Sequence, residues 1–491
     1  MARTDEPRRS RRPVKALGAL LVLALVAGAG VAWRTGKAEE WWDQIRSSDR
    51  PEPADPAAVA APPEVAERAV VRPAALAKPA DGTARLDRSA VEQALRQLND
   101  PDLGRHVLAA VGPLDGTGLS YRRAEGEPLA IPASTTKLVT STAALFLLGP
   151  EHTFETTTVL ERRGANPQLV LVGGGDPFLA RTPERDDPSD GTYQPDRADL
   201  RTLARRTARA LRNDGVRAVR LGYDDTLFSG PSVHPRWRPG YIPEETPPIS
   251  ALWVDEGRDA DGMRRSSGDP ALAAVAAFRQ QLTNAGITVK GTPSQVRAPA
   301  DADPVGVVTS PTVAQIVQRL LEVSDNAAAE VLFRQAGLAD QGEGSFEAGQ
   351  RAVKRALAAN GVKLGRSVLY DGSGLSRANR LAPSVLVSVI RLAASDAHPE
   401  LRPVLAALPV AGFTGSLTNR MDGGPAAGLG RVRAKTGTLS NVSSLAGIAV
   451  DQEGHLMAFA LMADRIKKPK ALLARVAMDN AAAALGACSC G

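Results

Sequence analysis

Apolar side chains recur at helical and at strand spacing from about residue 86 to the end of the chain. Residues 106–124 predict a strand, a turn and a second strand, and residues 138–147 predict a buried helix. Twice in the middle of the chain, in 198–225 and in 270–291, an amphipathic helix ends at a glycine and a strand follows. Alternation of this kind is typical of an α/β protein.

The last third of the sequence continues the mixture of helices and strands. Residues 312–337 predict two helices that are interrupted at 324–326, and a further helix covers 346–360. Residues 431–464 predict three strands, which are joined by a loop at 439–442 and by a turn, and a helix closes the chain. We therefore predict an α/β sandwich in which helices flank a central antiparallel sheet.

The beginning of the chain indicates export from the cytoplasm. Residues 1–15 hold six basic and two acidic side chains, and residues 16–33 form an uncharged apolar run. Small residues near the end of this run fit a cleaved signal peptide, whereas its length and the tryptophans at and after its end fit a retained membrane anchor. We expect residues 1–37 to be a basic head with an anchor, so that the rest of the chain lies outside the cell.

Composition limits the partners of the remaining chain. Residues 38–83 are rich in proline and alanine, which predicts a linker between the membrane and the folded part. The net charge of the 491 residues is +6, and most of it belongs to the basic head. No basic stripe is interleaved with aromatic residues, so we predict no nucleic-acid partner.

The two cysteines, Cys488 and Cys490, are separated by one residue at the end of the chain. A local disulfide, an intermolecular bridge and two free thiols all remain open, and the simplest interpretation is an incidental tail. No histidine or further cysteine accompanies them, so we predict no metal site.

The first candidate catalytic motif is Ser134-Thr135-Thr136-Lys137, directly before the predicted helix at 138–147. Side chains three positions apart share a face of a helix, so Ser134 and Lys137 would lie side by side. Alone, this stretch is most simply an ordinary helix start, because serine, threonine and proline all favour that position.

Two further motifs follow in the same chain, Ser324-Asp325-Asn326 and Lys435-Thr436-Gly437-Thr438. Alone, the first is a good helix-capping loop and the second is a strand that ends in a turn. The three motifs in this order are typical of penicillin-binding proteins and class A β-lactamases.

The chemistry explains why such residues would be combined. A serine hydroxyl needs an adjacent base, and Lys137 can accept the Ser134 proton only when it is neutral. Enclosure and a second cation at Lys435 would lower the pKa of Lys137. The backbone N–H groups of Ser134 and Thr438 would form an oxyanion hole, and Lys435, Thr436 and Thr438 would bind a terminal carboxylate.

The other motif residues would complete the site. Ser324 would relay a proton to the leaving group, and Asn326 would hold either the substrate carbonyl or Lys137. Gly437 would let the substrate backbone approach the strand closely.

Other chemistries lack their motifs. The five histidines form no H-E-x-x-H pair, and the chain contains no G-x-S-x-G elbow. The glycines at 173–175 lack the spacing of a dinucleotide-binding loop, so we predict neither a cofactor nor a metal.

Beyond these motifs, the sequence resembles the low-molecular-mass class C penicillin-binding proteins, which are D-alanyl-D-alanine carboxypeptidases with endopeptidase activity. The resemblance covers residues 86–485. It includes four segments that look like signatures of that family, at 171–179, 223–228, 324–332 and 371–383.

This resemblance implies a penicillin-binding/serine β-lactamase-like transpeptidase fold, with an α+β domain inserted at 154–300 into a catalytic domain formed by 84–153 and 301–491. Ser324 follows Ser134 by 190 positions, which is too long a spacing for a class A β-lactamase and leaves room for that insertion.

The resemblance also implies that a peptidoglycan stem peptide ending in D-Ala-D-Ala acylates Ser134, and that β-lactams inhibit the protein covalently. Two alternatives stay open: a β-lactamase, and a non-catalytic sensor that binds muropeptides or β-lactams. No local motif identifies the glutamate that a class A β-lactamase needs for fast deacylation.

Overall fold

The computed structural model describes residues 85–124, 128–162, 167–183, 193–258, 265–266, 268–299, 302–422 and 428–491. Every described residue belongs to one compact unit within Ala77–Gly491. The predicted anchor in 1–37 and the predicted linker 38–83 lie outside the described residues. In the described ranges, no helix is both long enough and apolar enough to cross a bilayer.

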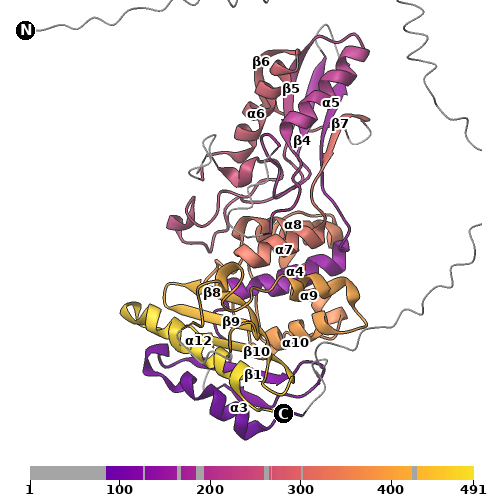
Figure 1. Ribbon diagram of the computed structural model, residues 1–491. Coiled ribbons are helices and arrows are strands. Elements are labelled where there is room, and N and C mark those ends of the chain that lie inside the picture. The colour runs from indigo at the N-terminus through magenta and orange to yellow at the C-terminus, as the bar shows by residue number, and fades with distance from the viewer. Residues whose placement is uncertain are drawn as a thin grey trace, which may run out of the picture. The chain divides into compact units, whose positions relative to one another are not determined.

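The first sheet has five antiparallel strands in the order β2-β1-β10-β9-β8 (Figure 1). Its strands are β1 (Val107–Pro113), β2 (Tyr121–Arg123), β8 (Val432–Leu439), β9 (Val442–Val450) and β10 (Leu456–Ala463). Strand β1, near the start of the described chain, pairs with β10, near its end. The predicted central antiparallel sheet is confirmed.

Helices cover both faces of this sheet. One face packs against α3 (Arg88–Ala94) and α12 (Ala471–Ala487). The core on the other face is shared by α4 (Thr136–Leu148), α7 (Val313–Val323), α8 (Asn326–Gln341), α9 (Phe346–Ala359), α10 (Pro383–Ala394) and α11 (Arg402–Ala406).

Strand β1 shows why two cores form. Leu108 and Ala110 point into the core of α4 and α10, whereas Ala109 and Val111 point into the core of α12. Successive side chains of a strand alternate between the faces of a sheet, so a fully apolar strand needs cover on both sides.

The second sheet has the order β6-β5-β4-β3-β7. Its strands are β3 (Glu155–Glu161), β4 (Gln168–Val172), β5 (Ala218–Asp224), β6 (Thr288–Gln295) and β7 (Pro304–Thr309). Strands β4, β5 and β6 are parallel, and the helices α5 (Leu200–Asn213) and α6 (Pro270–Asn284) connect them and share their core.

The two predicted helix–glycine–strand units are confirmed in this second sheet. Gly215 follows α5 at φ 73° and Gly286 follows α6 at φ 88°, each just before the strand that the helix leads into. A left-handed backbone is cheap for glycine and ends a helix sharply, which is why these stops are visible in the sequence.

The strand pairing bears on where the inserted segment ends. Strand β7 pairs with β3, so the second sheet extends past the predicted limit at residue 300. The first strand of the predicted insertion, β3, therefore runs antiparallel to β7, which lies beyond the predicted end of that insertion. The domain boundaries at 84–153, 154–300 and 301–491 stay a prediction.

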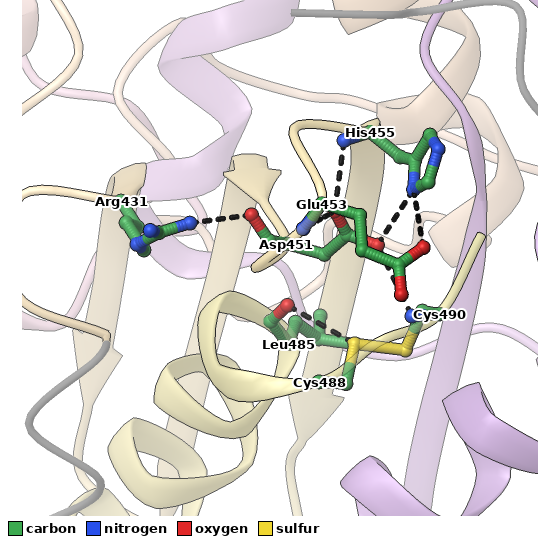
Figure 2. A network of polar contacts seen from close by, with 7 residues as sticks. All are labelled: Arg431, Asp451, Glu453, His455, Leu485, Cys488 and Cys490. Atoms are coloured by element: carbon green, nitrogen blue, oxygen red, sulfur yellow. Dashed lines mark hydrogen bonds and ion pairs between the residues drawn. A yellow bond between two sulfur atoms is a disulfide. The ribbon is translucent and has the colours of Figure 1, made fainter.

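Asp451, at the end of β9, holds the turn to β10 and the C-terminal tail together (Figure 2). Its carboxylate accepts hydrogen bonds from the backbone N–H groups of Glu453, His455 and Cys490, at 2.9, 2.8 and 3.1 Å. The His455 ring nitrogen Nδ1 lies 2.9 Å from the same carboxylate. The Glu453 carboxylate lies 3.7 Å from the same ring nitrogen, so the three side chains form one polar cluster.

The tail is further fixed by a disulfide between Cys488 and Cys490, which decides among the three states left open by the sequence (Figure 2). The carbonyl of Cys490 accepts a hydrogen bond from the N–H of Asp87, the residue that caps α3. The end of the chain is thus bonded to the first helix of the described part.

Asp451→Ala is expected to lower the free energy of unfolding by about 2 to 4 kcal/mol, because it leaves several N–H donors without their acceptor. Urea unfolding measures the change. The control is Glu453→Ala, whose side chain is 51% exposed and which should change stability by less than about 0.5 kcal/mol. Equal effects of the two substitutions would contradict the role assigned to Asp451.

Candidate active site

Ser134 lies in a short 3-10 turn, Ala133–Thr135, directly before α4, and its side chain is partly exposed. Ala133 has φ 48°, a left-handed conformation that is strained for a residue with a side chain. Gly374 packs against it so closely that a Cβ there would lie 1.9 Å from the Ala133 carbonyl oxygen. Strain of this kind persists only where the surroundings enforce it, and it often marks a functional residue nearby.

Lys137 lies in the first turn of α4 and is fully buried. Its Nζ donates to Ser134 Oγ at 2.9 Å, to Asn326 Oδ1 at 2.6 Å and to the carbonyl oxygen of Ser373 at 2.9 Å. The serine and the lysine are therefore neighbours, as their spacing predicted. Three acceptors satisfy the three hydrogens of a protonated ammonium group.

The second motif connects α7 to α8, as predicted. Ser324 ends α7 with φ 62°, and the carboxylate of Asp325 caps α8 by accepting from the N–H of Ala328. Asn326 begins α8, and its side-chain Nδ2 donates to the Glu245 carbonyl at 2.9 Å. That contact fixes the amide so that its oxygen faces Lys137.

The third motif lies on β8, an edge strand of the first sheet. Lys435 is fully buried, and its Nζ donates to Ser324 Oγ at 2.8 Å and to the Thr436 carbonyl at 2.9 Å. Thr436 is 8% exposed, whereas Thr438 is exposed. The three motifs thus meet in one place, with the hydroxyls of Ser134 and Ser324 each bonded to a buried lysine.

Gly437 lies where β8 packs against the segment that carries Ser134. A Cβ at this position would lie 2.1 Å from Ser444 Oγ, 2.6 Å from the Pro132 carbonyl oxygen and 3.1 Å from the Ser134 nitrogen. The chain that carries Ser134 therefore occupies the space that glycine leaves empty. The missing side chain lets β8 pack against the protein's own backbone. That a substrate backbone also approaches the strand here stays a prediction.

The loop at 371–376 also supports Lys137, through the Ser373 carbonyl, and this contact was not predicted from the sequence. The carboxylate of Glu330 accepts from the N–H groups of Gly372 and Ser373, at 3.1 and 2.7 Å. These bonds orient the Ser373 carbonyl toward Lys137. The sequence does contain one sign of this support. Glu330 lies in a stretch of α8 that is otherwise buried and apolar, and a buried glutamate needs hydrogen-bond partners.

Asp371 fixes the same loop from its other end. Its carboxylate accepts from the N–H groups of Gly374 and Ser376, from Asn379 Nδ2 and from the ring N–H of Trp237. Trp237 belongs to the predicted inserted segment, and this hydrogen bond measures 2.7 Å.

Burial lowers the pKa of Lys137 to about 8, and the nearby carboxylates of Asp325, Glu330, Asp371 and Glu245 offset part of that effect. Burial also lowers the pKa of Lys435 well below its ordinary value, and the charge of Lys137 lowers it further. Of the two predicted causes, enclosure is the main one, whereas the charge of Lys435 is not among the causes that act on the pKa of Lys137. Contact with Ser134, not pKa, identifies Lys137 as the candidate base.

The pKa of Glu330, a buried carboxyl group in the same region, is also shifted. Burial and the charge of Asp371 raise the pKa of Glu330 to about 8, although the two backbone N–H groups that it accepts from lower it. Both oxygens of Glu330 are occupied by the loop backbone, so its carboxylate supports that loop and does not face Ser134.

The arrangement supplies what acyl transfer to a serine needs. A nucleophile contacts a base of lowered pKa, and a second lysine and hydroxyl lie beside an open strand edge. The groups that touch Ser134 and Lys137 are an ammonium, an amide and a carbonyl, which is not a donor set for a metal ion.

Comparison with known proteins gives a family. The sequence pattern of the D-Ala-D-Ala carboxypeptidase 3 (S13) family matches residues 90–260 and 258–485. A carboxypeptidase of Mycobacterium tuberculosis is 34% identical over 403 residues, which cover 80% of this chain and 82% of that protein. Carboxypeptidase DacB of Mycolicibacterium smegmatis is 33% identical over 493 residues, which cover 99% of each protein.

Solved structures agree with the fold. Penicillin binding protein 4 of Haemophilus influenzae is similar with a TM-score of 0.65 and 21% identity, over 79% of this chain and 97% of that chain. A structure of the same protein complexed with a β-lactam has a TM-score of 0.58 and 20% identity, over 79% and 98%. The penicillin-binding fold expected from the sequence is confirmed.

The rate at which an acylating reagent modifies Ser134 is expected to rise with pH, with a midpoint near pH 8, because only neutral Lys137 can accept the proton. Asp325→Asn removes a negative charge that raises this pKa, yet asparagine still caps α8. The midpoint of that variant should therefore move to lower pH. Acylation rates measured across this pH range provide the test.

The control is Asp199→Asn, the same substitution at the N-cap of α5 in the second sheet. Its pH midpoint should equal that of the unaltered protein. A rate that does not depend on pH, or an upward shift in Asp325→Asn, would show that Lys137 is not the base.

Proposed function

The chain belongs to the D-Ala-D-Ala carboxypeptidase 3 (S13) family, and we propose that it is a serine-type D-Ala-D-Ala carboxypeptidase that acts on peptidoglycan stem peptides. The observation that carries this proposal is the 2.9 Å contact between Lys137 Nζ and Ser134 Oγ beside the second lysine–serine pair, Lys435 and Ser324. Each pair joins a hydroxyl to a buried amine, and the strand edge of β8 lies next to both.

Acylation begins when neutral Lys137 accepts the Ser134 proton. Ser134 Oγ then bonds to the carbonyl carbon of the penultimate D-Ala, and the backbone N–H groups of Ser134 and Thr438 stabilise the oxyanion. The C–N bond to the terminal D-Ala breaks as Ser324 relays to the leaving amine the proton that Lys137 accepted, which leaves Lys137 neutral again. Water hydrolyses the ester and restores Ser134.

Substrate recognition uses the open edge of β8. Lys435, Thr436 and Thr438 bind the C-terminal carboxylate, since an ammonium and two hydroxyls together match its charge and its acceptors. Asn326 holds Lys137 through its side-chain oxygen, and Gly437 brings the strand against the Ser134 backbone. The same residues serve endopeptidase cleavage when the bond is a cross-link between stem peptides.

β-Lactams are expected to acylate Ser134 in place of the peptide. Penicillin binding protein 4 of Haemophilus influenzae has been solved in complex with a β-lactam, which supports this expectation for a chain of the same fold.

The protein works outside the cytoplasm, because peptidoglycan lies there. We further propose that residues 16–33 remain attached as a membrane anchor, since an uncharged run of this length follows a basic head.

Ser134→Ala is expected to abolish covalent labelling by a fluorescent penicillin and to reduce D-Ala release from a D-Ala-D-Ala peptide about a thousandfold or more. Labelling is read on a denaturing gel. The control is Ser141→Ala on the same helix. That hydroxyl is buried and has no hydrogen-bond partner among the described residues, so it should be dispensable.

The same assay separates the alternatives. Fast turnover of a chromogenic cephalosporin would indicate a β-lactamase, and labelling without D-Ala release would indicate a non-catalytic sensor. Labelling that persists in Ser134→Ala would overturn the assignment of the nucleophile.

Mature protein from an expressing bacterium is expected in the membrane fraction with residues 16–33 intact, as read by intact mass and N-terminal sequencing. A soluble product that starts after this segment would replace the anchor with a cleaved signal peptide.

A further inference from the structure

A turn outside the three motifs lies between two of them. The turn Gly415–Leu417 follows a stretch that runs beside β8, where Val410 bridges to Arg433 and the Pro409 carbonyl accepts from the N–H of Ala434. This stretch covers the edge of β8 up to the residue before Lys435. Beyond that point, no described segment pairs with this edge through backbone hydrogen bonds.

The turn contacts two elements of the active site, α7 and β8. A Cβ on Gly415 would lie 2.5 Å from the carbonyl oxygen of Glu322, two residues before Ser324. The next side chain, Ser416, has its Oγ 3.0 Å from Thr436 Oγ1 on β8. One side of the turn therefore packs against the end of α7, and the other is bonded to the third motif.

The turn is well supported by its own chain. Leu417 is fully buried, and its carbonyl accepts from the N–H of Gly412 at 3.0 Å. The Thr418 hydroxyl donates to the Gly415 carbonyl at 2.9 Å. Arg420, further along, forms hydrogen bonds of 3.0 and 2.5 Å with Asp479 on α12. These contacts fix the backbone of the turn and therefore the position of Ser416.

The direction of the Ser416–Thr436 hydrogen bond follows from what Thr436 must do. A hydroxyl has a single hydrogen, and a carboxylate can only accept. When Thr436 donates to the substrate carboxylate, its oxygen is left to accept, and Ser416 is the hydroxyl in position to donate to it.

We propose that Ser416 is a positioning residue for substrate recognition, which orients the Thr436 hydroxyl toward the C-terminal carboxylate of the peptide. This inference rests on the proposed carboxypeptidase function. Ser416 acts through Thr436 and does not itself contact the reacting atoms.

The test compares kinetics of Ser416→Ala on one D-Ala-D-Ala peptide with a free C-terminal carboxylate and on the same peptide with a C-terminal amide. For the carboxylate, KM should rise about five- to tenfold with kcat nearly unchanged, as loss of one hydrogen bond to a charged contact implies. For the amide, kcat/KM should change less than about twofold. Acylation by benzylpenicillin and by its methyl ester gives the same comparison without turnover.

Two variants make the result specific. Ser416→Thr retains a hydroxyl and should restore the KM for the carboxylate substrate. Thr418→Ala removes a hydrogen bond within the same turn, and its ratio of carboxylate to amide activity should equal that of the unaltered protein.

The outcomes separate this inference from the function on which it rests. Equal losses of Ser416→Ala on both substrates, or no loss on either, would overturn the role of Ser416. If the unaltered protein releases no D-Ala and is not labelled by penicillin, the proposed function itself has failed.

Discussion

The burial of two ammonium groups, those of Lys137 and Lys435, is the constraint on which the rest of this structure depends. Removing an ammonium from water costs several kcal/mol unless hydrogen bonds replace the lost hydration. The acceptors come from the turn before α4, the connection of α7 and α8, the loop at 371–376 and β8. Four segments that are distant in sequence must therefore hold their positions for both lysines to be tolerated.

This constraint also explains why the site is reactive. An ammonium that is hydrated keeps its proton, whereas burial makes the neutral amine accessible near neutral pH. The surrounding carboxylates act in the opposite direction, so the pKa of Lys137 reflects a balance. The fold thus sets the reactivity of Ser134 through the enclosure of its neighbour.

The sequence predicted the parts of this site that depend on side-chain chemistry. The three motifs, the glycines that end α5 and α6, and the central sheet were recognisable because each requires particular residue types. The acceptors from Ser373 and Glu245 were not, because these are backbone carbonyls, which every residue carries. Their positions follow from tertiary packing alone.

The pairing of β3 with β7 gives the second sheet a stem of two adjacent strands, the arrangement expected of a module that could be exchanged or deleted. Two hydrogen bonds nevertheless join this segment to the groups around Lys137. Trp237 bonds to Asp371, and the Glu245 carbonyl fixes the amide of Asn326. Without the segment between β3 and β7, Asp371 and Asn326 would lose these partners, so the predicted insertion takes part in supporting the groups around Lys137.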